Sequence, residues 1–144
     1  MTIITFNSQV VGTTNFDVDV SKPETLTAIR DYINGLNADG NTAIYSAQSE
    51  AYQLATQDYA KEPDRVYSIV LMSDGENNSG ISQNEFFNDF KKMKGAESIR
   101  TFTILFGEAD QKSMQRIADG TGGRLFDASH DPLPFIFKEI RGYQ

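Results

Sequence analysis

An apolar, β-branched run from Val66 to Met72 ends abruptly in Ser73, Asp74 and Gly75. Such a run between turn residues is typical of a strand that is buried on both faces of a sheet. In open α/β sheets, ligands bind just outside the carboxyl ends of the strands, which is where Asp74 would lie. Because Asp-Gly is also a common turn signal, the sequence leaves two interpretations for Asp74: a ligand-binding residue or part of a strand-ending turn.

The segments that follow alternate between strand-like and helix-like patterns with short connections. This alternation predicts βα units, and therefore a mostly parallel sheet in a three-layer α/β fold with helices on both faces. Residues 2–6 and 9–14 predict a hairpin that adds one antiparallel strand at the edge of the sheet. The chain shows no linker or repeat, so residues 1–144 are expected to form a single domain. The further strands are expected at 99–106 and 124–127, and the helices between and after them at 82–94, 110–119 and from 131 onward.

Two short patterns predict where helices begin. Ser21 with Glu24, and Ser82 with Glu85, have the spacing of a capping box. A further helix is expected to begin at Thr42. Apolar residues at helical spacing predict one apolar face for the first helix and a buried stripe for the helix after Ser82. These are Leu26, Ile29, Ile33 and Leu36 in the first, and Phe86, Phe87, Phe90 and Met93 in the second.

Composition excludes several classes of function. The formal net charge is −7, which disfavours nucleic acid and anionic lipid as partners and leaves cations and basic protein surfaces. The chain has no cysteine and a single histidine, His130. Thiolate metal sites and cysteine nucleophiles are therefore excluded, and a Ser-His-Asp triad has little to build on. We find no apolar run long enough to span a membrane and no signal-peptide pattern.

Four segments, taken in order, carry a family resemblance. They are residues 3–8, 39–47, 70–77 and 103–126. Together they resemble a von Willebrand factor type A domain, whose motifs include a Gly-Gly-Thr-Ala-Leu-Tyr segment and an apolar strand that ends in Thr-Asp-Gly. Residues 137–144 also resemble the end of such domains in bacterial surface proteins that carry a solute-binding module. That second resemblance implies an extracellular or cell-surface location.

The family resemblance implies a metal-ion-dependent adhesion site for one divalent cation. Its ligands are an Asp-x-Ser-x-Ser run after the first strand, a threonine and an aspartate. By motif position, Thr42 matches the threonine and Asp74 the aspartate, whereas the first strand, the first helix and the Asp-x-Ser-x-Ser run have no match. We therefore expect a partial site that holds Mg²⁺ or Mn²⁺ weakly. Thr42 has an alternative role as the cap of its helix, and Glu76, Asn77 and Asn78 are expected on the rim.

The leading function is a protein- or peptide-binding module of the adhesion type, and not an enzyme. One alternative is a metal-free structural or assembly domain. Another is a small hydrolase that uses Asp74 as nucleophile or base, although no second catalytic group accompanies it in a known arrangement. A metal-binding measurement separates the first two classes, and a hydrolase screen tests the third.

The absence of the first strand has a structural consequence. In the family fold that strand is central, so residues 2–6 and 66–72 would here face an empty slot. Each buried, unpaired backbone group costs about 1–3 kcal/mol. Three outcomes follow: the first two strands slide over to pair with 66–72, a second copy fills the slot and forms a homodimer, or the chain is unstable alone. Association through the open edge is the outcome we expect.

Overall fold

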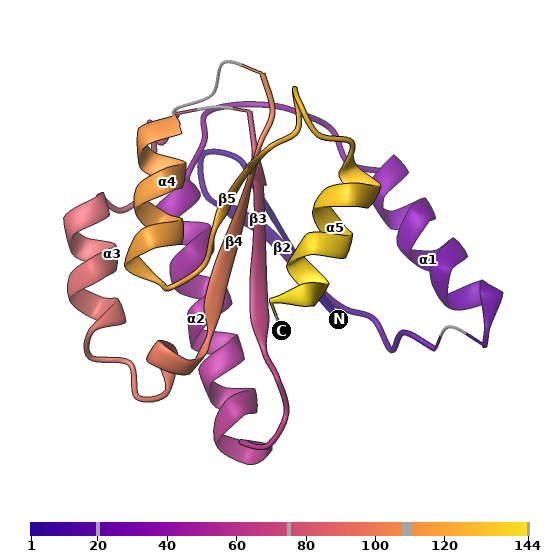
Figure 1. Ribbon diagram of the computed structural model, residues 1–144. Coiled ribbons are helices and arrows are strands. Elements are labelled where there is room, and N and C mark those ends of the chain that lie inside the picture. The colour runs from indigo at the N-terminus through magenta and orange to yellow at the C-terminus, as the bar shows by residue number, and fades with distance from the viewer. Residues whose placement is uncertain (20, 75, 108–110, 144) are drawn as a thin grey trace.

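The computed structural model describes residues 1–19, 21–74, 76–107 and 111–143 (Figure 1). Expectations placed on Gly75, Asp110 and Gln144 therefore fall outside the described residues. The elements, in order, are β1 (Thr2–Phe6), β2 (Val10–Asn15), α1 (Pro23–Asn34), α2 (Ile44–Lys61), β3 (Ser68–Ser73), α3 (Gln83–Phe90), a short 3-10 helix (Ala96–Ser98), β4 (Arg100–Leu105), α4 (Gln111–Gly120), β5 (Leu125–Asp127) and α5 (Leu133–Gly142).

The described strands form two separate sheets. Strands β3, β4 and β5 pair in parallel in that order, as the alternation predicted. Strands β1 and β2 form the predicted antiparallel hairpin, but the hairpin is not hydrogen-bonded to the parallel sheet. The predicted antiparallel strand pair is therefore present, but as a sheet of its own. The hairpin has also not slid over to pair with β3, so the closed-up sheet is excluded for the described residues.

Helix α2 explains why the hairpin stays apart. The side chain of Phe6 packs against the core cluster that contains Tyr45 and Leu71. At the end of β1, the Asn7 carbonyl accepts a 2.7 Å hydrogen bond from the N–H of Ala43, just before α2. The hairpin is thus fixed to the amino-terminal end of α2 instead of to a neighbouring strand.

One face of the parallel sheet, which we call the closed face, is covered by α2, α3 and α4 (Figure 1). Its core includes Tyr52, Leu71, Phe86, Met114 and Ile117, all buried. The phenylalanines of α3 lie on this face as predicted, with Phe86 fully buried. Apolar area removed from water stabilises a fold by roughly 25 cal/mol per Å², so this face carries most of the hydrophobic stabilisation.

The closed face also holds a buried polar network. The hydroxyl of Tyr52 lies 2.9 Å from both the Ile99 carbonyl and the Thr101 hydroxyl, and the Thr101 hydroxyl donates to Gln48 at 3.1 Å. The Thr121 hydroxyl accepts from the N–H of Thr101 at 3.2 Å. Among the described residues, no buried side-chain N or O atom lacks a hydrogen-bond partner. Burial of these polar groups is therefore compensated.

The opposite face, which we call the open face, is covered less completely. Helix α5 packs on β4 and β5, where Phe102, Ile104 and Phe126 are buried. On β3, however, Val70 is 37% exposed and Met72 is 42% exposed. The strand was predicted to be buried on both faces. It is buried at Leu71 on the closed face, but Val70 and Met72 on the open face are exposed, because no described helix lies over them.

Helix α1 lies on the same side as α5 but is set apart from the parallel sheet (Figure 1). It has no buried residue, and Leu26 and Ile33 are each 50% exposed. Its contacts run to the hairpin, where the ring of Tyr32 packs edge-on against Phe16 at 5.5 Å. The predicted apolar face of this helix exists, and it is largely exposed.

The two predicted capping boxes have different outcomes. In α3 the box forms: Ser82 accepts from the N–H of Glu85 at 3.3 Å, and Glu85 accepts from the N–H of Ser82 at 2.7 Å. In α1 it does not form, because the Ser21 hydroxyl donates to the Asp19 carboxylate at 2.6 Å. The N-cap of α1 is Lys22, which has no side-chain cap, and Pro23 begins the helix.

Candidate functional site

Three loops meet at one end of the molecule: the loop between β1 and β2, the loop before α2 and the loop after β3. The Ser79 hydroxyl donates to the Ser8 carbonyl at 2.7 Å, which joins the first and third loops. The N–H of Asn41 donates to the Ser8 hydroxyl at 3.0 Å, which joins the first and second. We call this group the loop cluster.

Thr42 is held in the loop cluster by its main chain. Its N–H donates to the Asn78 side-chain oxygen at 2.7 Å, and its carbonyl accepts from the N–H of Asn78 at 3.0 Å. Thr42 does not cap the following helix, so that alternative is wrong: α2 begins at Ile44, with Ala43 as an N-cap that makes no side-chain bond. At the amino terminus of α2, the N–H of Tyr45 donates to the side-chain oxygen of Asn77 at 3.2 Å.

Asp74 follows the last residue of β3 and is exposed. The paired bonds between Thr42 and Asn78 place the two site residues predicted from the motifs on neighbouring loops. No hydrogen bond joins their two side chains in the part of the chain that the structure describes. Asn77 and Asn78, which the sequence placed on the rim, also fasten the loops together. Ser8 and Ser79 were not singled out from the sequence. The only signal for them is the density of Asn and Ser in both loops.

A close approach at Gly80 completes the loop cluster. The N–H of Ile81 donates to the Ser46 hydroxyl on α2 at 3.0 Å. A Cβ atom on Gly80 would lie 2.2 Å from that same hydroxyl oxygen, and the φ angle of Gly80 is +74°. Both the space and the backbone conformation therefore require glycine here.

The family model of the von Willebrand factor type A domain matches residues 1–137. The chain belongs to this family. The resemblance in the four motifs and the α/β fold class are thereby confirmed. No curated protein sequence matches the chain.

Solved structures share the fold of this A domain. A von Willebrand factor type A protein from Catenulispora acidiphila aligns with a TM-score of 0.56 and 17% identity, over 85% of this chain and 25% of that one. Proximal thread matrix protein 1 of the mussel byssus aligns with a TM-score of 0.59 and 19% identity, over 96% of this chain and 33% of that one. The chain thus spans about a quarter to a third of these two structures.

In the loop cluster, two side chains match the family's metal ligands by motif position. Thr42 and Asp74 offer a hydroxyl and a carboxylate, whereas Mg²⁺ demands a near-octahedral shell of oxygens. The side-chain oxygens of Asn77, Asn78 and Ser8 already accept hydrogen bonds from backbone N–H groups. Within the described ranges, no group of three or more His, Cys, Asp or Glu residues could hold a metal ion.

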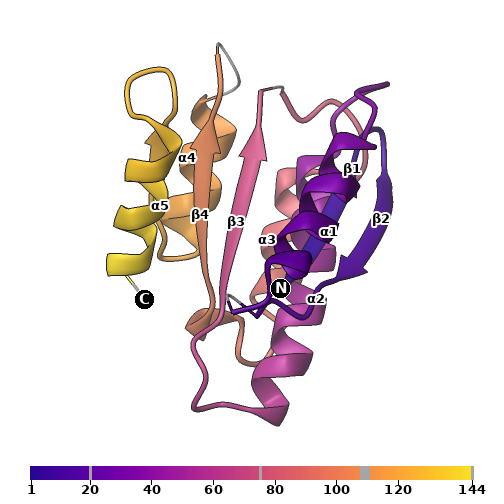
Figure 2. The same cartoon turned by 90° about the vertical axis from the view of Figure 1, so that its right-hand side faces the viewer.

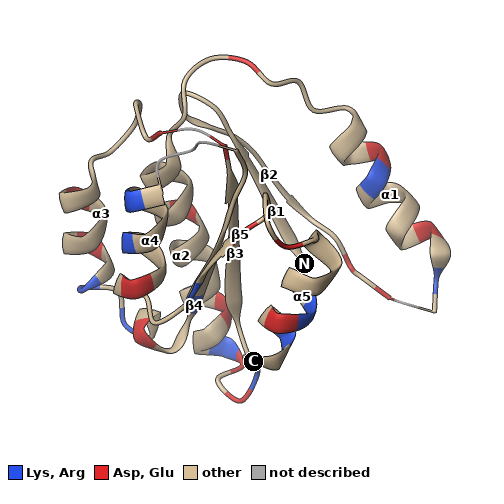
Figure 3. Ribbon diagram, turned by 45° about the horizontal axis from the view of Figure 1, so that its top comes forward, with Lys and Arg blue, Asp and Glu red and all other residues tan. Residues whose placement is uncertain are grey.

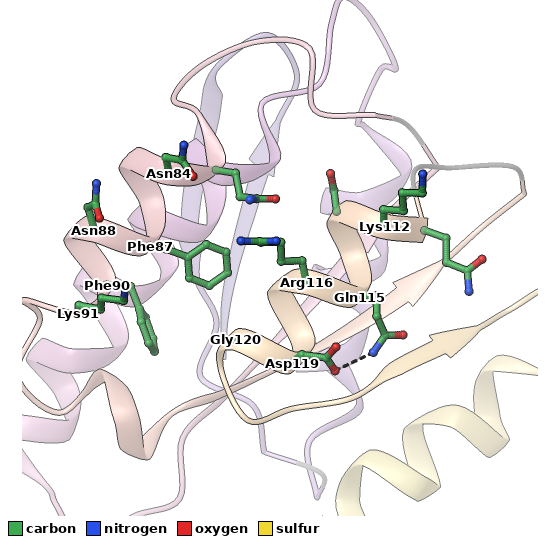
Figure 4. A pocket seen from close by; sticks show the side chains of 13 residues that line it. Asn84, Phe87, Asn88, Phe90, Lys91, Lys112, Gln115, Arg116, Asp119 and Gly120 are labelled. Atoms are coloured by element: carbon green, nitrogen blue, oxygen red, sulfur yellow. Dashed lines mark hydrogen bonds between the residues drawn. The ribbon is translucent and has the colours of Figure 1, made fainter.

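A second polar surface lies between α3 and α4. This groove has a volume of about 1090 Å³ and includes neither Thr42 nor Asp74. Figure 4 shows Phe87 and Phe90 of α3 on one side and Arg116 and Asp119 of α4 on the other. The Phe87 ring fits against Gly120, where a Cβ atom would come within 2.4 Å of it. The aromatic residues of α3 are thus partly core and partly groove wall.

The charged residues of the A domain are interspersed. Figure 3 shows both basic and acidic residues on α1, α4 and α5. This distribution agrees with the net charge of −7 in disfavouring nucleic acid. None of the described helices is long and apolar enough to cross a membrane.

Proposed function

We propose that this A domain is a protein- or peptide-binding module of the adhesion type, which engages its partner through the loop cluster and acts by binding and not by catalysis. The observation that carries the proposal is the set of hydrogen bonds that fasten the three loops to one another and to α2. Loops held in one conformation lose little entropy when a partner binds. Domains of this family commonly bind proteins.

The negative charge of the loop cluster favours a partner with a basic surface. Asp39, Asp74 and Glu76 are all exposed on the loops that form the cluster. Their carboxylates add to a chain whose net charge is −7. Complementary charge speeds association and selects among partners more than it adds affinity.

In this proposal a divalent cation binds the loop cluster only weakly. Mg²⁺ or Mn²⁺ would be held by Thr42 and Asp74, and two protein oxygens compete poorly with the hydration shell of the ion. Titration calorimetry of Mg²⁺ against the chain should therefore show weak binding. Tight binding that Asp74→Ala abolishes would show that further ligands complete the site.

The main experiment selects peptides from a phage-displayed random library on the immobilised chain. Binding is then measured on the parent and on a double variant, Asp74→Lys with Glu76→Lys. We expect selected peptides to be basic and to bind the double variant at least about tenfold more weakly. The matched control is Glu24→Lys with Asp31→Lys on α1, which should leave affinity unchanged. Equal losses in both double variants would contradict the role of the loop cluster.

Association of two copies is the second candidate, and it corresponds to the metal-free assembly role. The observation that favours it is that β1 and β3 each have one edge without a partner among the described strands. Light scattering over a tenfold dilution series tests it, since a homodimer dissociates on dilution and a monomer does not change. For the hydrolase alternative, the parent and Asp74→Ala should be equally inactive in a broad hydrolase screen.

A further inference from the structure

The groove between α3 and α4 is formed by these two neighbouring helices and their ends (Figure 2). Its lining residues fall within 83–91 and 111–120, and neither the hairpin nor β3 contributes to it. At a rise of about 1.5 Å per residue, the eight residues of α3 and the ten of α4 form walls of about 12 and 15 Å. The groove is therefore long enough to receive about two to three turns of another helix.

Each wall presents one stripe of side chains to the groove. The stripes are Asn84, Phe87, Asn88 and Lys91 on α3 and its C-cap, and Lys112, Gln115, Arg116 and Asp119 on α4. Both have the spacing i, i+3, i+4, i+7, which places four side chains on one face of a helix. Two such stripes along one hollow form a surface on which a further helix packs. An extended segment would find no backbone ladder there, because hydrogen bonds within each helix use the main-chain groups.

The apolar part of the groove consists of Phe87 and Phe90. Both side chains are half-buried, and their rings lie edge-on with centroids 6.5 Å apart. Figure 4 shows Phe87 and Arg116 pointing into the groove from opposite walls. The exposed part of the two rings offers a contact for an apolar side chain of an occupant, since burying apolar surface is favourable.

The groove differs in charge from the rest of the chain. Its lining includes the basic residues Lys91, Lys112 and Arg116, and one acidic residue, Asp119. The whole chain, by contrast, has 13 basic and 20 acidic residues. The Asp119 carboxylate also accepts a hydrogen bond from Gln115 at 2.7 Å. The groove is thus a locally basic surface on an acidic domain.

Two of these basic side chains have no acidic partner among the described residues. Four other lysine and arginine residues pair with a carboxylate three residues earlier, as Lys92 does with Asp89 at 3.0 Å. Arg116 and Lys91 form no ion pair in the part of the chain that the structure describes. A guanidinium group can donate two parallel hydrogen bonds to one carboxylate, so Arg116 is suited to an acidic side chain from outside the chain.

We propose that the groove between α3 and α4 binds an acidic amphipathic helix of a partner protein. An apolar side chain of that helix packs against Phe87 and Phe90, and its aspartate or glutamate residues pair with Arg116 and Lys91. The helix needs about two to three turns, the length of the walls. The groove includes neither Thr42 nor Asp74, so this site is separate from the loop cluster and holds or fails independently of the proposed function.

The first test uses a fluorescein-labelled peptide of about fifteen residues. Leucines at the spacing i, i+3, i+4, i+7 form one stripe, glutamates flank it, and alanines fill the remaining positions. One matched peptide has glutamine for each glutamate, and another has proline for a central alanine, which breaks the helix. Fluorescence anisotropy should show saturable binding of the first peptide and at least about fivefold weaker binding of the other two. Equal affinity of the three peptides, or no saturable binding, would overturn the proposal.

Variants of the chain locate the binding. Arg116→Glu with Lys91→Glu should bind the acidic peptide at least about fivefold more weakly than the parent, with an unchanged circular dichroism spectrum. The matched control is Arg30→Glu with Lys138→Glu, which makes the same change in net charge at exposed positions of α1 and α5. The control should bind like the parent, and an equal loss in both double variants would overturn the proposal.

Two further measurements separate this site from the other interactions considered for the domain. Asp74→Lys with Glu76→Lys, in the loop cluster, should retain binding of the acidic peptide, whereas loss of binding would show that the peptide does not occupy the groove. Light scattering of the chain alone tests a second copy as the occupant. A homodimer that Arg116→Glu with Lys91→Glu dissociates would overturn the proposal.

Discussion

The closed and open faces of the parallel sheet differ in how completely they are covered. On the closed face, α2, α3 and α4 bury a continuous core around Tyr52 and Phe86, together with a satisfied polar network. On the open face, α5 covers β4 and β5, while α1 stands apart with no buried residue. The closed face thus holds the larger part of the buried core, and the open face leaves strand and helix surface exposed.

Strand β3 shows this difference between consecutive residues. Leu71 is 4% exposed on the closed face, and Met72 is 42% exposed on the open face. Both belong to the same apolar run, so their different burial comes from what lies over each face and not from the strand itself.

The largest expected effect is on the closed face. Phe86 is fully buried and its ring packs against Tyr52, Phe87 and Phe90. Phe86→Ala should lower the free energy of unfolding by about 3–5 kcal/mol, because it removes apolar contact and leaves a cavity. Urea unfolding measures this loss. Phe135→Ala, in α5 where Phe135 is 48% exposed, is the matched control and should cost less than about 1 kcal/mol.

The second prediction compares the two faces of β3 directly. Leu71→Ala should cost about 2–5 kcal/mol, the usual range for a buried leucine. Met72→Ala should cost less than about 1 kcal/mol, because the side chain already contacts water. Urea unfolding of the two variants and the parent measures both losses in the free energy of unfolding. Equal losses would show that the open face is covered in solution, for example by a second copy.

The sequence predicted those parts of the fold that depend on local patterns. The alternation after residue 66 gave the parallel sheet, and the box from Ser82 to Glu85 gave the start of α3, because each signal lies within a few residues. The similar box from Ser21 to Glu24 does not form, because the Ser21 hydroxyl donates to Asp19, which lies outside the pattern. The spacing of the motif alone does not show which neighbouring group the serine side chain will bond to.

The candidate site was harder to predict because its contacts span long stretches of sequence. Thr42 fitted the role of a helix cap, but the cap comes from Asn77, which lies in another loop. The reciprocal bonds between Thr42 and Asn78 are likewise invisible to a pattern of neighbouring residues. Periodicity predicted the apolar stripe of α1, but it carries no information on whether another element covers the stripe.

A smaller effect is expected from the polar network. Tyr52→Phe removes the hydroxyl that donates to the buried Ile99 carbonyl and leaves that acceptor unsatisfied. The free energy of unfolding should fall by about 1–3 kcal/mol in urea unfolding. The matched control is Tyr32→Phe on α1, whose hydroxyl lies 3.4 Å from Thr5 in a half-buried position and should contribute less. A larger loss in the control would contradict the assignment of stability to the closed face.

The smallest expected effect on stability comes from the residues at the starts of α3 and α1, and it depends on pH. Hydrogen bonds from Ser82, the side-chain bond first and the backbone bond second, lower the pKa of the Glu85 carboxyl below its usual value of 4.5. A pKa that is lower in the folded state stabilises the fold above about pH 4.5, and this stabilisation is lost as the pH falls through the lower folded value.

Glu85→Gln should therefore lower the urea midpoint slightly at neutral pH, and the difference from the parent should shrink as the pH is lowered to about 3. Glu24→Gln in α1 is the matched control at neutral pH. Ser21 bonds to Asp19 and completes no box there, so this substitution should change the midpoint less. A difference between Glu85→Gln and the parent that stays constant with pH would show that the carboxylate charge does not contribute, and that the box acts only through neutral hydrogen bonds.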